Sequence, residues 1–599
     1  MALRVDATYA ANPAVTRGSS TKLSASPDGK KVVYCQGRTV FLRDLENPQS
    51  TLVYAQHAHP VTVARIAPSG FYAASGDTSG LVRVWDLASG ELMLKLQTQA
   101  LSGKITDLQW DGESKRIIAV GDGRERFGHA FLFDSGSSVG EISGHSKPIN
   151  AVAIRRQRPF RAVTAGDDTH VVFYTGVPFK YSKTLSGHTR FVQDVAYAAD
   201  GSTFASCGSD GQVLVYDGQS GDQQQALGEQ QAHNGTVYGV SYAPDSKHLA
   251  TAGADGLVKV WRVENGECVA TWDATERAAS KVDAQLVGLV WAQPQVLIAV
   301  GLGGALYVLD FALSSASLEA RVLFAPTKGI SSLAYAPLRH SLVAGSYDGR
   351  VYEYTSGNVS AEPLASGAPS IVGVAAREAE IDYVSLDDAL RRIQDTVSAP
   401  ISLTAQPRSL AVTPMAALVA SEQGIDVVTD AVDHHSAASL QVGNVTAVGA
   451  QVDNGKMVAV GTEDAKVHLF SDWKPVATLE NGRSTITALA FSPDGTLLAA
   501  GESSGKVLVY DVKAQSLKLS HWVFHSGRIA ALAWNVEGTH CASASLDTHV
   551  FVWSVERPMK HAVYKNAHAG GAAGVAWTDN GLASAGADGV VRTWHVDLP

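Results

Sequence analysis

The sequence is poor in cysteine and in charged side chains. Its cysteines, Cys35, Cys207, Cys268 and Cys541, form no CxxC pair, so neither a disulfide framework nor a zinc site is expected. We expect reduced thiols that are mostly buried. Charged residues make up only 18% of 599 residues, and the net charge of -10 disfavours binding to nucleic acid or to an anionic membrane, because both would be repelled.

Long apolar runs are also missing. No segment approaches the roughly 18 consecutive apolar residues that a membrane-spanning helix needs. The N-terminal segment MALRVDATYA has neither the basic nor the apolar region of a signal peptide. We therefore expect a soluble intracellular protein without membrane insertion.

Glycine is abundant, with 56 residues, and one segment pattern recurs along the whole chain. Examples are GLVRVWDL (80–87), GQVLVYDG (211–218), GLVKVWRV (256–263) and GKVLVYDV (505–512). The pattern occurs about fourteen times with a period of roughly 42 residues, which is typical of WD repeats. Its expected ends are Asp44, Asp86, Asp134, Tyr174, Asp217, Trp261, Asp310, Tyr354, Asp388, Asp430, Asp472, Asp511, Ser554 and His595, of which the ninth, in EAEIDYVSLDDALRRI, is the weakest match.

This repeat predicts an all-β fold made of two tandem seven-bladed WD-repeat β-propellers. Known propellers close at roughly four to eight blades, so fourteen units fit two rings better than one. We expect one propeller over 11–326 and a second over 327–599. The last unit stops after its third strand, VRTWHVDLP, and lacks a fourth, whereas unit seven has its own in ARVLFA, 320–325. Residues 1–10 are therefore expected to supply the strand that closes the second ring.

Histidine, a hydroxyl residue, aspartate and an aromatic residue recur together within the units. Sets with offsets of 18, 22 and 28 residues from the histidine are His188, Ser206, Asp210, Tyr216; His233, Thr251, Asp255, Trp261; and His525, Ser543, Asp547, Trp553. Sets with a slightly shifted histidine are His145, Thr164, Asp168, Tyr174 and His568, Ser584, Asp588, Trp594. One copy would suggest hydrolytic catalysis. Five copies at blade spacing instead predict a buried hydrogen-bond chain that stabilises each blade.

The segments that depart most from the generic repeat lie between residues 101 and 191. They include WDGESKRIIAVGDGRERFGHAF, GVPFKY and GHTRFVQDV. These strings resemble the actin-interacting protein 1 family, and the resemblance extends over the whole chain in length and in repeat number. It implies a non-enzymatic cytoplasmic and cytoskeletal factor that binds actin filaments decorated with ADF/cofilin, promotes their severing and disassembly, and caps barbed ends.

Candidate partner-binding residues are those that the repeat does not require. The turn GRERFG carries Arg124, Glu125, Arg126 and Phe127 where most blades have a simple ADG turn. Asp167 is an additional carboxylate beside the structural Asp168, and is expected to be free to face a partner. For Glu125 the alternative is pairing with Arg124 or Arg126, and for Asp167 it is capping of the turn.

A second group of candidates lies in the next outer strand and loop. Tyr181 and Phe191 lie ten residues apart and are flanked by Lys180 and Arg190. Aromatic residues beside basic ones are typical interface anchors, although Phe191 could instead pack between blades. The family resemblance implies that Glu125, Asp167, Tyr181 and Phe191 face actin; at position 181 tyrosine replaces the phenylalanine of some relatives. Phe127 and Phe179 are secondary candidates, because such residues are more often buried.

Competing interpretations remain open. A generic WD-repeat scaffold, such as a ubiquitin-ligase receptor, is the alternative function, but it would need a recruitment segment outside the repeats. For an enzyme, we find no Walker loop, HExxH, GxSxG or paired-cysteine motif. His434 and His435 are adjacent, and a strand would point them to opposite faces. Arg155, Arg156, Arg158 and Arg161 are interpreted as a solvated loop or blade edge rather than a basic patch. We expect a monomer without metal or cofactor.

Overall fold

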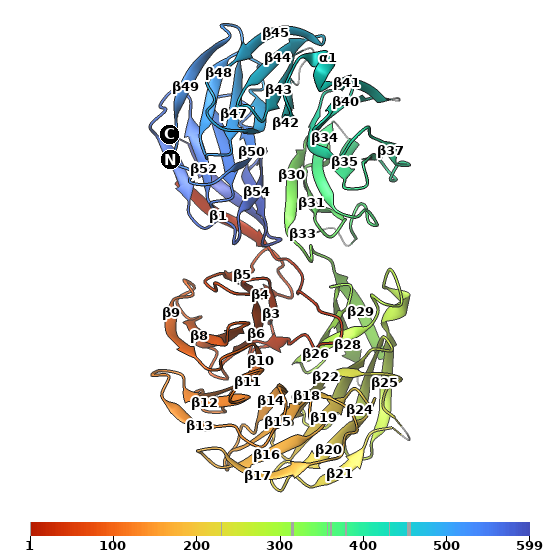
Figure 1. The fold of residues 1–599 in the computed structure, drawn as a ribbon. Helices are drawn as coiled ribbons and strands as arrows, with labels where there is room; N and C mark the ends of the chain where they lie inside the picture. Colours follow the sequence, from red (N-terminus) through yellow and green to blue (C-terminus); the bar gives the residue numbers. More distant parts are fainter. Residues whose placement is uncertain are drawn as a thin grey trace. The chain divides into compact units, whose positions relative to one another are not determined.

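The computed structural model of the chain describes residues 2–228, 231–312, 317–355, 358–359, 362–377, 380–429, 432–451 and 457–598. Over these residues the regular structure is almost entirely β, arranged as fourteen four-stranded antiparallel sheets (Figure 1). Thirteen sheets are meanders of four consecutive strands, and the fourteenth has the order β1-β56-β55-β54. The predicted all-β fold with about fourteen propeller blades is confirmed.

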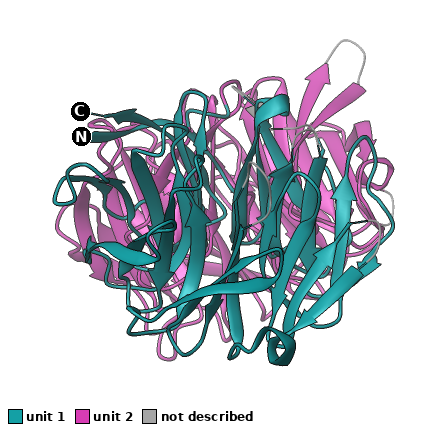
Figure 2. Cartoon of the chain, turned by 90° about the horizontal axis from the view of Figure 1, so that it is seen from above, with its two compact units in different colours: residues 1–11, 48–50, 324–599 teal, residues 12–47, 51–323 magenta. Residues whose placement is uncertain are grey.

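The chain divides into two compact units, coloured separately in Figure 2. One unit comprises Asn12–Asn47 and Thr51–Leu323, and we call it the first propeller. The other comprises Met1–Ala11, Pro48–Ser50 and Phe324–Pro599, and we call it the second propeller.

The first propeller contains seven sheets. Their strands are β2 (Ser24–Ala25), β3 (Lys31–Gln36), β4 (Thr39–Asp44), β5 (Leu52–Tyr54); β6 (Val61–Ile66), β7 (Tyr72–Asp77), β8 (Leu81–Asp86), β9 (Leu94–Gln99); β10 (Ile105–Trp110), β11 (Arg116–Gly121), β12 (Gly128–Leu132), β13 (Ser138–Glu141); β14 (Ile149–Ile154), β15 (Arg161–Gly166), β16 (Val171–Thr175), β17 (Lys180–Leu185); β18 (Val192–Tyr197), β19 (Thr203–Gly208), β20 (Val213–Asp217), β21 (Gln223–Ala226); β22 (Val237–Tyr242), β23 (His248–Gly253), β24 (Leu257–Arg262), β25 (Glu267–Asp273); and β26 (Leu286–Gln293), β27 (Val296–Gly301), β28 (Leu306–Ala312), β29 (Ser317–Leu323). A 3-10 turn spans Ala274–Glu276.

The second propeller contains the other seven sheets. Their strands are β30 (Ile330–Ala336), β31 (Ser341–Ser346), β32 (Val351–Thr355), β33 (Asn358–Val359); β34 (Ile371–Arg377), β35 (Glu380–Ser385), β36 (Ala389–Ile393), β37 (Ile401–Ser402); β38 (Pro407–Val412), β39 (Ala417–Ser421), β40 (Gly424–Val428), β41 (Val432–Ser436); β42 (Val445–Ala450), β43 (Met457–Thr462), β44 (Val467–Ser471), β45 (Lys474–Leu479); β46 (Ile486–Phe491), β47 (Leu497–Glu502), β48 (Val507–Asp511), β49 (Ser516–Trp522); β50 (Ile529–Trp534), β51 (His540–Ser545), β52 (Val550–Ser554), β53 (His561–Tyr564); and β54 (Ala572–Thr578), β55 (Gly581–Gly586), β56 (Val591–Asp597), with β1 (Ala2–Tyr9). Short helical turns span Pro337–Arg339 and α1 (Ala437–Leu440).

The innermost strand of each sheet packs against the innermost strands of its two neighbours. In the first propeller the series β2, β6, β10, β14, β18, β22 and β26 returns to β2, and in the second β30 to β54 return to β30. Alternating apolar residues fill the spaces between blades; the second and third strands are the most completely buried. At Gly80, with φ of +86°, a Cβ would collide with the carbonyl oxygen of Leu101, so the turn between β7 and β8 requires glycine.

Strand β1 pairs antiparallel with β56, from Ala2 opposite Asp597 to Tyr9 opposite Val591. In Figure 1 it is the red strand among the blue ones, beside the C-terminus. Leu3, Ala7 and Tyr9 of β1 are buried in two apolar clusters of the second propeller. The sheet β26–β29 has its own outer strand, β29. This strand begins at Ser317, three residues before the expected start at Ala320. The first strand of the chain is thus the outer strand of the last blade.

The end assigned to the ninth unit was wrong. Asp388 precedes the third strand, β36, and adopts a left-handed φ of 54° in the turn before it. This strand, ALRRI, ends at Ile393 and contains neither the aromatic residue nor the aspartate that marks the end of most third strands. Asp430, the expected end of the tenth unit, lies outside the described residues.

Two further expectations concern cysteines and membranes. Cys35, Cys207 and Cys541 are buried free thiols, whereas Cys268 is exposed. No helix among the described residues is long and apolar enough to cross a bilayer.

Candidate functional site

The repeated histidine sets form continuous hydrogen-bond chains. In the last blade, Trp594 Nε1 donates to Ser584 Oγ at 2.8 Å, Ser584 lies 2.7 Å from His568 Nε2, and His568 Nδ1 lies 3.0 Å from Asp588 Oδ1. Because Asp588 can only accept and the serine hydrogen is free to point at Nε2, the chain runs from tryptophan to aspartate through a neutral imidazole. The backbone N–H of Ala569 also donates to Asp588.

The other four predicted sets have the same geometry. Their histidine Nδ1 atoms lie 2.7–3.1 Å from the aspartate, and their Nε2 atoms lie 2.7–2.8 Å from the hydroxyl oxygen. The hydroxyl residues are fully buried: Thr164, Ser206, Thr251, Ser543 and Ser584. A buried hydroxyl offers no nucleophile to a substrate, so this arrangement serves the scaffold.

A sixth chain, in blade two, has a different spacing from the five predicted ones. His57 lies 2.7 Å from Ser75 Oγ and 2.9 Å from Asp77, and Trp85 donates to Ser75 at 3.1 Å. Serine and tryptophan keep the offsets of 18 and 28 residues, but aspartate comes at 20 instead of 22. Allowing the shorter offset already seen for His568 and Asp588 would have identified it.

Burial and hydrogen bonding shift the pKa of these carboxylates in opposite directions. Burial raises the pKa of Asp547, but the hydrogen bond from His525 and backbone N–H groups outweigh it and lower that pKa to about 2. For His568, burial is the dominant effect and lowers its pKa, although Asp588 opposes this. The pKa of Asp588 is also lowered, so in the last blade the aspartate is charged and the histidine neutral at physiological pH, as a chain of hydrogen bonds from Trp594 to Asp588 requires.

The GRERFG turn joins β11 to β12. Arg124 and Glu125 are exposed, and the backbone N–H of Arg124 donates to Ser102 Oγ at 3.1 Å. Arg126 pairs with Glu141 at 3.2 Å, and not with Glu125. Among the described residues Glu125 has no side-chain hydrogen bond or ion pair, so its carboxylate is available to solvent.

Phe127 and Phe179 pack in an apolar cluster between blades three and four rather than on the surface. Phe179 is 3% exposed and lies in a cluster with Ile142 and Tyr174, against which the partly buried Phe127 packs. The prediction of Phe179 as a partner contact was therefore wrong, because its side chain fills the interior beneath the turn between β16 and β17. Phe127 serves mainly as packing.

Asp167 is half-buried and already has a partner, which corrects the expectation of a free carboxylate. The side-chain amide of Asn150 donates to Asp167 Oδ1 at 2.7 Å and to the carbonyl oxygen of Val192 at 3.0 Å. In the two preceding blades this position is Thr62 or Thr106, whose hydroxyls contact backbone carbonyls of their own blade and of the next inner strand. Asparagine thus links Asp167 to the residue that follows Phe191.

Tyr181 and Phe191 are both exposed aromatic side chains, at 50% and 47%. The Tyr181 hydroxyl lies 3.1 Å from Thr184 Oγ1, and its ring packs against Gly144. Phe191 lies in the connection from β17 to β18, where its carbonyl oxygen accepts from Ser209 N–H at 2.8 Å. Exposure of Phe191 rules out burial between blades. Lys180 and Arg190 are exposed beside them.

The topology brings three of the four principal candidates to one end of their blades. In a four-stranded meander, the turn between strands two and three lies at the same end as the connection to the next blade. Glu125 and Asp167 occupy such turns, and Phe191 occupies such a connection. Tyr181 instead follows the turn between strands three and four, so its backbone starts from the opposite end of blade four.

Other sequence candidates have local partners. Arg155 donates to the carbonyl oxygen of Gly201 and Arg158 pairs with Glu113 at 2.6 Å, so the arginine cluster is held by neighbouring loops. His434 lies 2.6 Å from Asp426, whereas His435 stacks on Trp473. Over the described ranges, no group of three or more His, Cys, Asp or Glu side chains could hold a metal ion.

Comparison with known proteins gives matches along most of the chain. Residues 48–86, 179–217, 224–262 and 319–354 match the WD domain, G-beta repeat family, and 452–537 match the anaphase-promoting complex subunit 4 WD40 domain. Actin-interacting protein 1 of Drosophila melanogaster is 37% identical, covering 87% of this chain and 86% of its own length. The chain belongs to the actin-interacting protein 1 family. WD repeat-containing protein 1 of Bos taurus is 35% identical over 86% of each chain, and the 66 kDa stress protein of Physarum polycephalum is 37% identical over 88% of each.

Only some of the candidate residues lie within the segments that match the WD-repeat family. Tyr181 and Phe191 fall inside the matched segment 179–217, together with the structural set of His188. Glu125 and Asp167 lie outside the four matched segments. In this member of the actin-interacting protein 1 family, the exposed end of blades three to five therefore combines repeat positions with residues that the repeat does not specify.

Proposed function

We propose that this protein binds actin filaments without catalysing a reaction. In this function it cooperates with ADF/cofilin to sever and disassemble filaments and caps the barbed ends that result. It acts as a monomer in the cytoplasm, at actin-rich structures. Support comes from family membership, since a relative that matches over 87% of this chain and 86% of its own length carries the name actin-interacting protein 1.

The partner surface that we propose consists of Glu125, Asp167 and Phe191, with Tyr181 at its side and Arg124, Arg126, Lys180 and Arg190 around it. The observation that carries it is the Asn150 bridge, which holds Asp167 against the strand that begins beside Phe191. Exposed aromatic side chains are frequent binding hot spots. Because these residues sit on short turns of closed sheets, little conformational entropy is lost on binding.

The mixed charges around the candidate residues suit a partner surface that carries both acidic and basic groups rather than charge of one sign. Glu125 presents an unpaired carboxylate beside Arg124, and Phe191 lies beside Arg190. Mixed charges around an aromatic anchor fix orientation more than they add affinity. Such a surface suits a filament on which two proteins, actin and cofilin, contribute neighbouring contacts.

Co-sedimentation of the purified protein with actin filaments tests this function. We expect the protein to pellet strongly, or filaments to be lost from the pellet, only when cofilin is present. No effect of the protein with or without cofilin would refute the proposal. Tracking filament length by fluorescence microscopy then separates severing from barbed-end capping, because capping stops growth at one end without new ends appearing.

A further inference from the structure

The centres of the two propellers differ in chemistry. We compare two positions of the innermost strands, the third and the fifth residue; in the first blade, where β2 spans only Ser24–Ala25, Lys22 and Ser24 occupy them. In the second propeller these positions are all small and uncharged: Ser332, Gly373, Ser409, Ala447, Ala488, Ala531, Gly574 and Ala334, Ala375, Ala411, Gly449, Ala490, Ala533, Ala576. In the first propeller they are Lys22, Val63, Asp107, Ala151, Asp194, Gly239, Gly288 and Ser24, Arg65, Gln109, Ala153, Ala196, Ser241, Val290. A seven-bladed ring of this chain therefore closes without charged residues at its centre.

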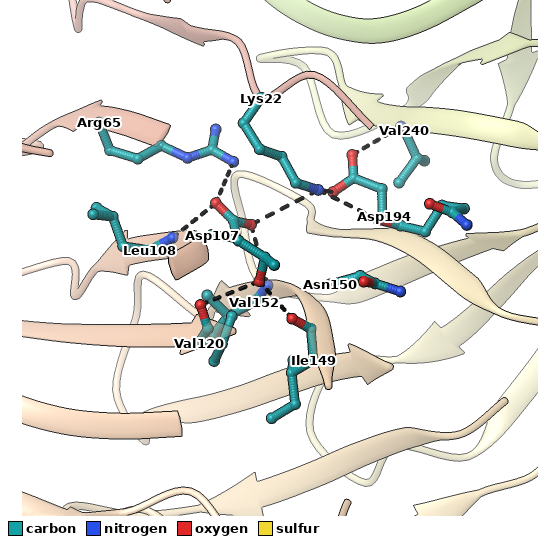
Figure 3. Close-up of polar contacts among 12 residues, drawn as sticks. Lys22, Arg65, Asp107, Leu108, Val120, Ile149, Asn150, Val152, Asp194 and Val240 are labelled. Carbon is teal, nitrogen blue, oxygen red and sulfur yellow. Dashed lines mark hydrogen bonds and ion pairs between the residues drawn. The ribbon is translucent and has the colours of Figure 1, made fainter. Parts of the chain in front are cut away.

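An ion network in the first propeller joins Lys22, Asp107 and Asp194, at the third position, to Arg65, at the fifth (Figure 3). Lys22 Nζ lies 2.7 Å from Asp194 Oδ1 and 4.0 Å from Asp107 Oδ2. Arg65 Nη2 lies 3.0 Å from Asp107 Oδ1. The same two carboxylates accept backbone N–H groups of the next inner strands, from Val152 and Val240 at 3.2 Å each. Both aspartates are therefore fully engaged.

A cavity of about 370 Å³ lies against this network. All seven residues of the fifth position line it, and none of them is acidic. Its size is at the lower end of the range of small-molecule sites, roughly 300–1,000 Å³. Arg156 also lines the cavity and adds a positive charge, while the one carboxylate in the lining, that of Asp194, is paired with Lys22.

Several polar side chains in the cavity wall have N–H or O–H hydrogens that form no hydrogen bond among the described residues. Each terminal nitrogen of Arg65 makes one hydrogen bond, to Leu23 O or to Asp107, and keeps a second hydrogen. Gln109 Oε1 accepts from Trp110 N–H and Ser241 Oγ accepts from Trp291 N–H, so the amide hydrogens of Gln109 and the hydroxyl hydrogen of Ser241 remain. Ser24 contributes a further hydroxyl.

We propose that this cavity binds a small phosphate-type oxyanion, with Arg65, Ser24, Gln109 and Ser241 as donors. An arginine together with hydroxyl and amide donors in the same cavity wall matches the several acceptor oxygens of a phosphate group. The ligand is inorganic phosphate or the phosphate group of a small monoester. The second propeller, with alanine or glycine at every fifth position, has no counterpart.

Isothermal titration of the full-length protein tests the site. Inorganic phosphate and glycerol 2-phosphate are the two probes, each at matched ionic strength against sodium chloride. We expect one saturable site per chain for at least one probe. Binding of both identifies recognition of the terminal phosphate group, and binding of one identifies which source the cavity accepts. Absence of saturable binding of either probe at millimolar concentration would overturn the proposal.

Variants decide whether the bound anion occupies this cavity. Arg65→Lys keeps the charge beside Asp107 but removes the spare hydrogens of the guanidinium group, and should weaken binding at least about tenfold, or about 1.4 kcal/mol. Arg158→Lys, the same change outside the cavity, should leave the affinity unchanged. If Arg65→Lys lowers the melting temperature strongly, the phosphate affinity of the double variant Ser24→Ala and Gln109→Ala is measured instead. This double variant leaves the ion network intact. Unaltered affinity in that double variant would contradict the assignment.

Discussion

The side-chain amide of Asn150 donates to the carboxylate of Asp167 at 2.7 Å, and its second hydrogen bond reaches the inner strand of the next blade at Val192. A carboxylate that would otherwise be a mobile surface group is thereby held next to Phe191. In the preceding blades Thr62 and Thr106 take the place of Asn150, and their hydroxyls reach the next inner strand but, among the described residues, no carboxylate. Blade five carries a related exchange, in which Gln193 contacts Ser209 at 3.0 Å.

Replacing Asn150 by threonine should separate stability from partner binding. The hydroxyl can take the backbone contacts that Thr62 and Thr106 make, so the free energy of unfolding should change by less than about 1 kcal/mol. Asp167 loses its hydrogen-bond donor, so the amount of protein pelleting with cofilin-decorated actin should fall. Unchanged pelleting in this variant would show that the orientation of Asp167 does not matter.

The histidine chains should contribute to stability, not to activity. Asp210 accepts from His188 and from the backbone N–H groups of Thr189 and Gln212. Asp210→Asn should cost about 1–3 kcal/mol of unfolding free energy, because buried donors lose a charged acceptor. Asp134→Asn, at an exposed turn of the same propeller, is the matched control and should be neutral. Urea denaturation of both variants provides the measurement, and equal stabilities would contradict the structural role.

Stability should fall when the pH drops below about 6.5, the ordinary pKa of histidine. Burial lowers the folded-state pKa of His57 and His568. Below pH 6.5 the unfolded chain therefore takes up protons that the folded chain does not, and unfolding is favoured by up to about 1.4 kcal/mol per pH unit for each histidine. Urea melts between pH 7.5 and 5.5 should show this loss. A constant unfolding free energy over that range would argue against neutral histidines in the chains.

Deletion of residues 1–10 should weaken the second propeller more than the first. The deletion removes β1, exposes the edge of β56 and uncovers the apolar clusters that contain Leu3 and Tyr9. Hydrogen exchange followed by mass spectrometry should show faster exchange in β54–β56, with β2–β29 little changed. Equal acceleration in both propellers would contradict a closing role of β1.

Spacing along the sequence identified the blades and most of the histidine chains, because each set lies within one repeat. His57 was missed since its aspartate is displaced by two residues, and the ninth unit was ended at Asp388 because Ile393 replaces the usual aromatic residue. Burial of Phe179 depends on the shape of a turn between strands, which composition does not determine.

Contacts between blades could not be predicted in the same way. Asn150 and Val192 are 42 residues apart, and Lys22 and Asp194 are 172 apart. Only the ring geometry brings these positions together. The repeat nevertheless held part of the information, since aligning the inner strands shows charged residues at the centre of one propeller and none at the centre of the other.

Pelleting of the triple variant Glu125→Ala, Asp167→Ala, Phe191→Ala with cofilin-decorated actin filaments tests the central claim most directly. The matched control is Glu91→Ala, Asp134→Ala, Phe71→Ala, which removes two acidic residues and one exposed aromatic residue from turns at the opposite ends of blades. We predict that the first variant loses cofilin-dependent pelleting while its melting temperature and that of the control stay close to wild type. Wild-type pelleting by the first variant, or equal loss in both variants, would contradict the assignment of the partner surface to blades three to five.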